Sequence, residues 1–94
     1  MTEYVLITFA STFAALRAQK YLTGYLPFQV MPVLREISSS CGIALRIACA
    51  DLDFANNRLS ASGMEPDTWR VYQVKQTGCA YLIEPVKTTE GSPN

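Results

Sequence analysis

The chain has 94 residues, of which 49% are hydrophobic, and its formal net charge is zero. This length predicts a single domain with one core between a sheet and one or two helices, and the apolar fraction excludes intrinsic disorder. The balanced charge and the lack of a polybasic run argue against a phosphate-backbone binder, so we expect no nucleic-acid partner.

The sequence predicts no membrane segment and no exported protein. No apolar run reaches the roughly 20 residues that cross a bilayer. Glu3 stands where a signal peptide would carry basic residues. The cysteines Cys41, Cys49 and Cys79 are odd in number and have no paired spacing, which argues against a disulfide framework. We therefore expect a cytoplasmic protein whose thiols are reduced and which has no contact with a membrane.

The sequence contains no histidine. This absence removes the usual general base of serine and cysteine hydrolases and the commonest zinc ligand. The cysteines match no CxxC metal motif. We therefore expect no metal and no resident cofactor, and we do not expect a self-sufficient enzyme.

The first part of the chain predicts a strand, a helix and a second strand. Residues 4–9 (YVLITF) are apolar and β-branched, which is typical of a buried strand, and Ser11 and Thr12 follow as candidate N-caps. The apolar face of the helix is formed by Ala14, Ala18, Tyr21, Leu22 and Tyr25. Gly24 and Pro27 should end the helix. Residues 28–33 (FQVMPV) predict an edge strand, because their proline cannot donate to a ladder.

The rest of the chain predicts a loop, a strand, a helix and a strand. Residues 34–42 (LREISSSCG) are typical of a loop, and residues 43–49 (IALRIAC) alternate as a strand that directs Cys49 into the core. Asp51 is the candidate cap of a second helix. The inner face of this helix is formed by Leu52, Ala55 and Leu59. Residues 69–74 (WRVYQV) alternate as a fourth strand.

The order β-α-β-β-α-β predicts an α+β fold, a ferredoxin-like two-layer sandwich with an antiparallel sheet and both helices on one face. Residues 81–83 (YLI) either add a short fifth strand or cover the sheet. Residues 1–87 should form one domain, and residues 88–94 a flexible tail. The residues that we expect to be largely buried are Leu6, Ala18, Leu22, Leu45, Ile47, Leu52, Ala55, Leu59 and Val71.

Two apolar edges predict self-association. The strand that contains Pro32 should lie at one edge of the sheet, and the apolar residues 81–83 leave surface near the C-terminus. A second copy related by a two-fold axis could cover either surface. We therefore expect a homodimer.

The segment from Pro32 to Arg46 contains Cys41, the candidate reactive residue. A thiol reacts as its thiolate, whose pKa falls near backbone amides or cations. Serines and a glycine beside the cysteine permit an anion-binding nest, and an arginine stands on each side. The candidate residues for stabilising the anion are Arg35, Ser38, Ser39, Ser40, Gly42 and Arg46. From the spacing alone, a polar hairpin loop with a structural Cys41 fits equally well.

The segment PVLREISSSCGIALRI resembles the signature of a family of short prokaryotic proteins described as selenium/sulfur carrier-like. The family pattern is a strand, a helix of the type ALxAxKxL, a strand ending in PxPREISSSCG, then ALR and an acidic residue that opens a second helix. This chain is similar over about residues 4–74, with STFAALRAQKYL, MPVLREISSSCG, IALRI and Asp51. It departs from the pattern at Leu34, where the family has a proline, and it continues beyond the family's usual end at residues 75–94.

The resemblance implies that Cys41 carries a chalcogen atom. Its thiolate would accept sulfur or selenium from a cysteine desulfurase-type donor, hold it as a persulfide or perselenide, and pass it to an acceptor enzyme. No cofactor other than this transient covalent atom is implied. One alternative is a non-enzymatic ferredoxin-like module that binds a partner or a small anion. Another is a thiol redox sensor, which would require a resolving cysteine.

Overall fold

The computed structural model describes residues 2–34, 42–63, 68–78 and 80–86. In chain order, the elements are β1 (Thr2–Phe9), α1 (Thr12–Leu22), β2 (Gln29–Pro32), β3 (Ile43–Ile47), a short 3-10 helix η1 (Cys49–Asp51), α2 (Leu52–Ala61), β4 (Trp69–Thr77) and β5 (Ala80–Val86). The predicted strands and helices are all present, with ends that differ from the prediction by a few residues.

The described strands form one antiparallel sheet in the order β2-β3-β1-β4-β5. The central strand β1 pairs with β3 from Val5 opposite Ile47 to Thr8 opposite Ala44, and it pairs with β4 along its whole length. β2 lies at one edge, as its proline predicts, and β5 forms the other edge beside β4. Residues 81–83 therefore belong to a fifth strand, and the predicted α+β class is confirmed.

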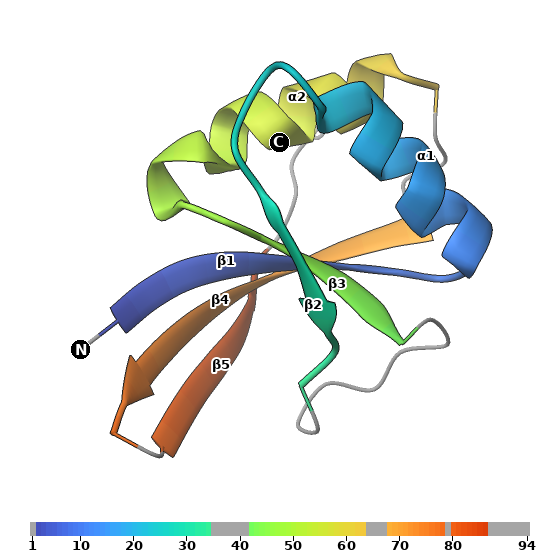
Figure 1. Cartoon of the computed structure of the whole chain (residues 1–94). Coiled ribbons are helices and arrows are strands. Elements are labelled where there is room, and N and C mark those ends of the chain that lie inside the picture. Colours follow the sequence, from blue (N-terminus) through green and yellow to red (C-terminus); the bar gives the residue numbers. More distant parts are fainter. Residues whose placement is uncertain (1, 35–41, 64–67, 79, 87–94) are drawn as a thin grey trace.

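Both helices lie on the same face of the sheet (Figure 1) and share one core with it. Every second residue of β1, namely Val5, Ile7 and Phe9, points into this core. The buried side of α1 consists mostly of alanines, and short side chains let a helix lie close to a sheet. The other buried members of the core are Ala14, Ala15, Ala18, Leu22, Leu26, Leu45, Ile47, Ala55, Leu59, Trp69 and Val71.

The opposite face of the sheet carries a second, smaller apolar cluster. Its buried members are Tyr4, Leu6, Ala44 and Val74. The partly buried side chains that pack against them are Met31, Val33, Leu34, Tyr72 and Ile83. Side chains from the end of β2, from the two residues after it and from the start of β3 therefore pack together on this face, away from the helices.

The predicted core is confirmed except at Leu52, which is half-buried. Tyr25 was expected on the buried side of the first helix, and this prediction is wrong, because the ring is 56% exposed. The reason is that α1 ends at Leu22, so the helical period does not extend to Tyr25. Gly24 then follows with a φ of +87°, a left-handed conformation that favours glycine.

The start of α1 confirms the predicted cap, and the start of α2 does not. The hydroxyl of Ser11 accepts a hydrogen bond of 3.1 Å from the backbone N–H of Ala14, which satisfies one free amide of the first turn. Asp51 precedes α2, but its side chain makes no capping hydrogen bond. α2 instead continues directly from η1.

The packing of α1 is tested by replacing leucines on its two sides. Leu22→Ala should lower the free energy of unfolding by about 2–5 kcal/mol, because the fully buried side chain leaves a cavity. Leu16 on the same helix is 55% exposed and provides the control. Leu16→Ala should change the free energy of unfolding by less than about 0.5 kcal/mol. Urea denaturation in dilute solution measures both. Equally small losses would contradict the packing of α1 on the sheet.

Candidate functional site

The structure describes Gly42 and Arg46 among the predicted site residues. The remaining predicted site residues, Cys41, Arg35, Ser38, Ser39 and Ser40, lie outside the described residues. Both ends of the segment that contains them are described, because Leu34 precedes it and Gly42 follows it. These ends determine where the segment leaves the sheet.

The segment that contains Cys41 joins two neighbouring antiparallel strands. Pro32 of β2 lies opposite Ile43 of β3, and the backbone N–H of Val33 donates a 3.1 Å hydrogen bond to the carbonyl of Gly42. At the same end of the sheet, β1 finishes and α1 begins, since Thr8 lies opposite Ala44. The connection from β2 to β3 therefore starts and finishes at the same end of the strands as the start of α1 (Figure 1).

Gly42 stands in open space. It is exposed, and a Cβ built on it would meet no atom within 4 Å. Its φ is not positive, unlike those of Gly24, Gly63 and Gly78. No described feature of the backbone at Gly42 requires glycine.

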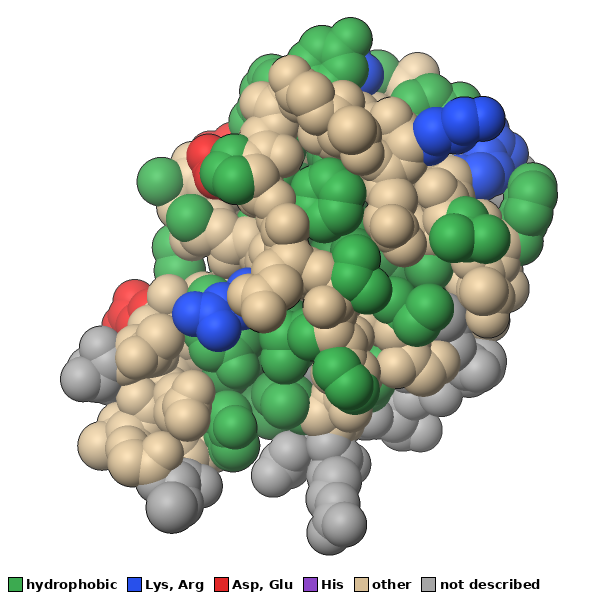
Figure 2. Space-filling model, in the orientation of Figure 1, with side chains coloured by type: hydrophobic (Ala, Val, Ile, Leu, Met, Phe, Trp, Pro, Cys, Tyr) green, Lys and Arg blue, Asp and Glu red, His purple; other side chains and the backbone are tan. Residues whose placement is uncertain are grey.

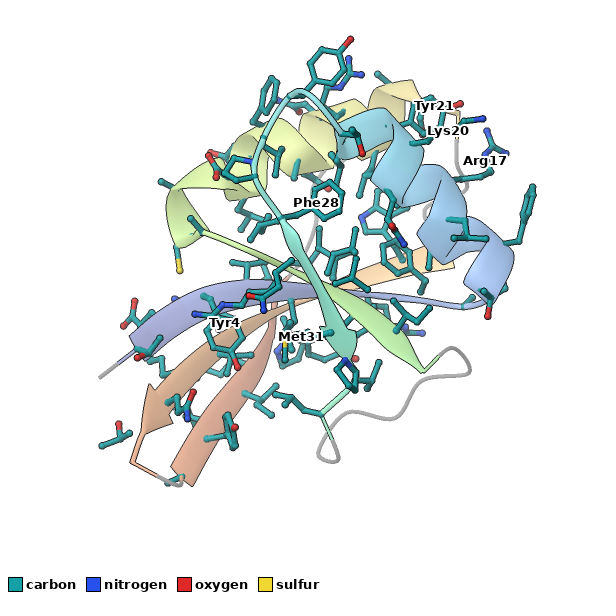
Figure 3. The ribbon with its side chains drawn as sticks, in the orientation of Figure 1. Tyr4, Arg17, Lys20, Tyr21, Phe28 and Met31 are labelled. Atoms are coloured by element: carbon teal, nitrogen blue, oxygen red, sulfur yellow. The ribbon has the colours of Figure 1, made fainter. Side chains whose placement is uncertain are left out.

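Arg46 contacts an aromatic ring on the face opposite the helices. Its side chain is half-buried, and the guanidinium carbon lies 4.1 Å from the centre of the Tyr4 ring. A cation over an aromatic face is attracted by the ring quadrupole. Figure 3 shows Tyr4 and Met31 on the side of the sheet away from α1 and α2.

The strand register shows the direction in which Arg46 extends. Arg46 lies opposite Leu6, and Tyr4 lies two residues further along β1, away from Thr8 and Ala44. The guanidinium is therefore displaced towards the end of β3 that is remote from Gly42. The contact of Arg46 with Cys41 stays a prediction. The sequence does not predict the stack with Tyr4, because the stack depends on which strand pairs with β1 and in which register.

The buried Tyr4 phenol has a perturbed acidity. Burial raises the pKa of Tyr4 above its ordinary value, the nearby Tyr81 raises this pKa further, and the positive charge of Arg46 opposes both effects. Loss of a proton would place a negative charge in the second apolar cluster, where solvation is poor. The phenol therefore stays neutral at physiological pH.

Cys49 is exposed, so the prediction that it points into the core is wrong. Its alternation with Ile43, Leu45 and Ile47 continues in the sequence, but β3 ends at Ile47 and Cys49 begins η1. A residue outside the strand no longer follows the period of two.

Cys49 also lies at the opposite end of β3 from Gly42. Five residue steps separate Gly42 from Ile47, which corresponds to roughly 17 Å along a strand. A disulfide requires Cα atoms within about 7 Å. Cys49 is therefore far from Gly42, the residue that follows Cys41 in the chain. Cys79 lies outside the described residues.

Two further features are absent from the described residues. Within residues 2–34, 42–63, 68–78 and 80–86, no three cysteine, aspartate or glutamate side chains come together as a metal site would require. Among the helices in the same ranges, none combines the length and the apolar character needed to span a bilayer.

The pKa of Tyr4 predicts an alkaline loss of stability. A raised pKa in the folded state stabilises the fold below the unfolded pKa of about 10, and this contribution is lost as the pH rises through the folded pKa. Tyr4→Phe retains a ring for Arg46 but cannot ionise, so its free energy of unfolding should fall less steeply above about pH 10. Urea titrations at a series of alkaline pH values measure both proteins. Identical slopes would contradict this role of Tyr4.

The exposure of Cys49 predicts a neutral substitution. Cys49→Ser should change the free energy of unfolding by less than about 0.5 kcal/mol, because the side chain faces solvent. Thermal unfolding followed by circular dichroism measures this change. A loss above roughly 1 kcal/mol would show that the thiol is packed after all.

Comparisons with known proteins give a family match. No curated protein and no solved structure matches the chain. The family model described as "Putative Se/S carrier protein-like" matches residues 4–70, which extend from β1 to the start of β4 and include Cys41. β5 lies beyond the matched region. Because the match covers more than half of the 94 residues, the chain belongs to the selenium/sulfur carrier-like family.

Proposed function

We propose that this protein carries sulfur or selenium on the thiol of Cys41 between a donor enzyme and an acceptor enzyme. The observation that carries the proposal is the family match over residues 4–70, which contains the whole REISSSCG segment. The position of Gly42 supports it, because the residue directly after Cys41 is exposed and uncrowded at one end of the sheet. A carried atom has to reach two different partner sites, so it belongs at such an accessible end.

The transfer consists of two displacements. The Cys41 thiolate attacks the terminal sulfur of a persulfide on the donor's cysteine, a new S–S bond forms at Cys41, and the donor's S–S bond breaks. The donor cysteine leaves as a thiolate, so no external oxidant or reductant is required. The acceptor's thiolate then removes the terminal sulfur from Cys41 by the same step. The donor class that we propose is a cysteine desulfurase-type enzyme.

The loaded persulfide is an anion at neutral pH and requires donors nearby. We assign this role to the backbone amides and hydroxyls of residues 38–42 and to the guanidinium of Arg35. Arg46 follows on β3, but its described contact is the Tyr4 ring, so Arg35 is the first candidate for the charge. The reaction involves no proton transfer from an imidazole, which suits a chain without histidine.

We also propose that the fold is a ferredoxin-like sandwich. The order β2-β3-β1-β4, with β3 between the two strands that α1 connects, supports a ferredoxin-like sandwich to which β5 has been added. Thiolate chemistry of this kind requires a reducing compartment, which supports a cytoplasmic location. A ferredoxin-like interaction module with a structural Cys41 is the alternative that the following experiment excludes.

Persulfide loading tests the function of Cys41. The Cys49→Ser/Cys79→Ser protein retains one thiol, which avoids background reaction at the exposed Cys49. After incubation with a cysteine desulfurase and cysteine, this protein should gain the mass of one sulfur atom by intact mass spectrometry. The further change Cys41→Ser should abolish this gain and leave the circular dichroism spectrum unchanged. Unchanged sulfur gain without Cys41 would exclude the carrier function.

A further inference from the structure

Exposed apolar side chains gather on the helices and on the chain that follows α1. We call α1, Asp51, α2 and Tyr25 the helix layer. Large apolar side chains at its surface include Phe13 and Leu16 of α1, Tyr25, and Phe54 of α2. Figure 2 shows hydrophobic side chains at the top and right of the molecule, over this layer. An exposed group of this kind is typical of an interaction surface.

The outer face of α1 combines apolar and basic side chains. The buried side of α1 consists of Ala14, Ala15, Ala18 and Leu22. At 100° per residue, Phe13, Leu16, Arg17 and Lys20 fall on the opposite side. Figure 3 shows Arg17 and Lys20 on this outer side of α1. The described part of α1 contains no acidic residue, so its outer face is positively charged.

Arg17 is held in position before any partner binds. Its guanidinium carbon lies 5.8 Å from the centre of the Phe13 ring and 5.7 Å from that of Tyr21. Its Nη2 also donates a 3.1 Å hydrogen bond to the Tyr21 hydroxyl. A side chain that is already ordered loses less entropy when a partner binds.

The outer face of α2 carries the opposite charge. Ala55 and Leu59 are the buried residues of this helix, so Asp53, Phe54 and Asn57 lie on its outer side. Asp51 directly precedes the helix. Figure 2 shows acidic side chains at the left of the layer and basic ones at its right. The helix layer is therefore acidic at one end and basic at the other.

The remaining cation of the layer is engaged within the molecule. Arg58 donates hydrogen bonds of 3.3 Å from Nε and 3.1 Å from Nη2 to the carbonyl of Tyr21. Its guanidinium carbon also lies 3.6 Å from the centre of the Tyr25 ring. Arg58 thus joins α2 to the end of α1. The charges of the layer that remain for a partner are those of Arg17, Lys20, Asp51 and Asp53.

We propose that the helix layer is the surface by which two copies of this chain associate, with α1 of one copy packed against α2 of the other. A two-fold axis in the plane of the interface brings the basic end of each layer over the acidic end of its partner. Phe13 and Leu16 then meet Phe54 of the second copy. The proposed partner is a second copy of this chain, because the basic residues, the acidic residues that complement them and the exposed apolar residues all lie on the same layer.

This arrangement differs from the dimer predicted from the sequence, which used the edge strands. It leaves β2 and β5 outside the interface. The proposal does not depend on the carrier function. The helices are short, so we expect an interface near the lower limit of about 1,200 Å² and a weak dimer.

A matched pair of leucines distinguishes the helix layer from the β5 edge. Leu16 on α1 is 55% exposed, and Leu82 on β5 is 54% exposed. Leu16→Gln should raise the dimer dissociation constant by about tenfold or more, and Leu82→Gln should leave it within roughly twofold, as measured by sedimentation equilibrium. A monomer at every concentration, or a dimer weakened by Leu82→Gln alone, overturns the proposal.

A charge exchange tests the pairing of α1 with α2. Arg17→Glu/Lys20→Glu and Asp51→Arg/Asp53→Arg should each weaken self-association, because like charges then face each other. An equimolar mixture of the two variants should associate at least as tightly as the wild type, because every facing pair is again opposite in sign. Circular dichroism confirms that each variant is folded. A mixture that associates no better than either variant alone also overturns the proposal.

Discussion

The central strand β1 is buried on both faces, and the rest of the molecule is arranged around its two sets of side chains. Val5, Ile7 and Phe9 face the helices, whereas Tyr4 and Leu6 face the second cluster. A slip of one residue would exchange the two sets and place Tyr4 under the alanines of α1. The pairings of β1 with β3 and β4 therefore determine the register of the whole sheet.

This register also determines where reactive groups can stand. Because Thr8 lies opposite Ala44, the connection that contains Cys41 and the first turn of α1 are at the same end of the sheet. Cys49 is at the other end of β3, and Arg46 is drawn towards Tyr4. The segment with Cys41 thus leaves the sheet at the end where α1 begins and where Val86 of β5 pairs with Val71.

The candidate site was predictable to the extent that it is local in sequence. Cys41, its serines and Arg35 are neighbours in the chain, so their proximity follows from covalent connection alone. The contact of Arg46 was not predictable in this way, because it depends on the pairing of Leu6 with Arg46. This pairing brings the guanidinium carbon to 4.1 Å from the centre of the Tyr4 ring. The exposure of Cys49 was not predictable either, because the alternation of IALRIAC does not reveal that the strand stops at Ile47.

The sequence by itself determined the order of the elements, the α+β class, the edge position of the proline strand and nearly all of the core. Each of these depends on local periodicity and on backbone chemistry, such as the missing N–H of Pro32. Only the tertiary structure decided that Tyr25 and Cys49 are exposed, and that acidic and basic residues occupy opposite ends of the helix layer. These features depend on contacts between segments distant in the chain, and the periodicity of one segment contains no information about its neighbours in space.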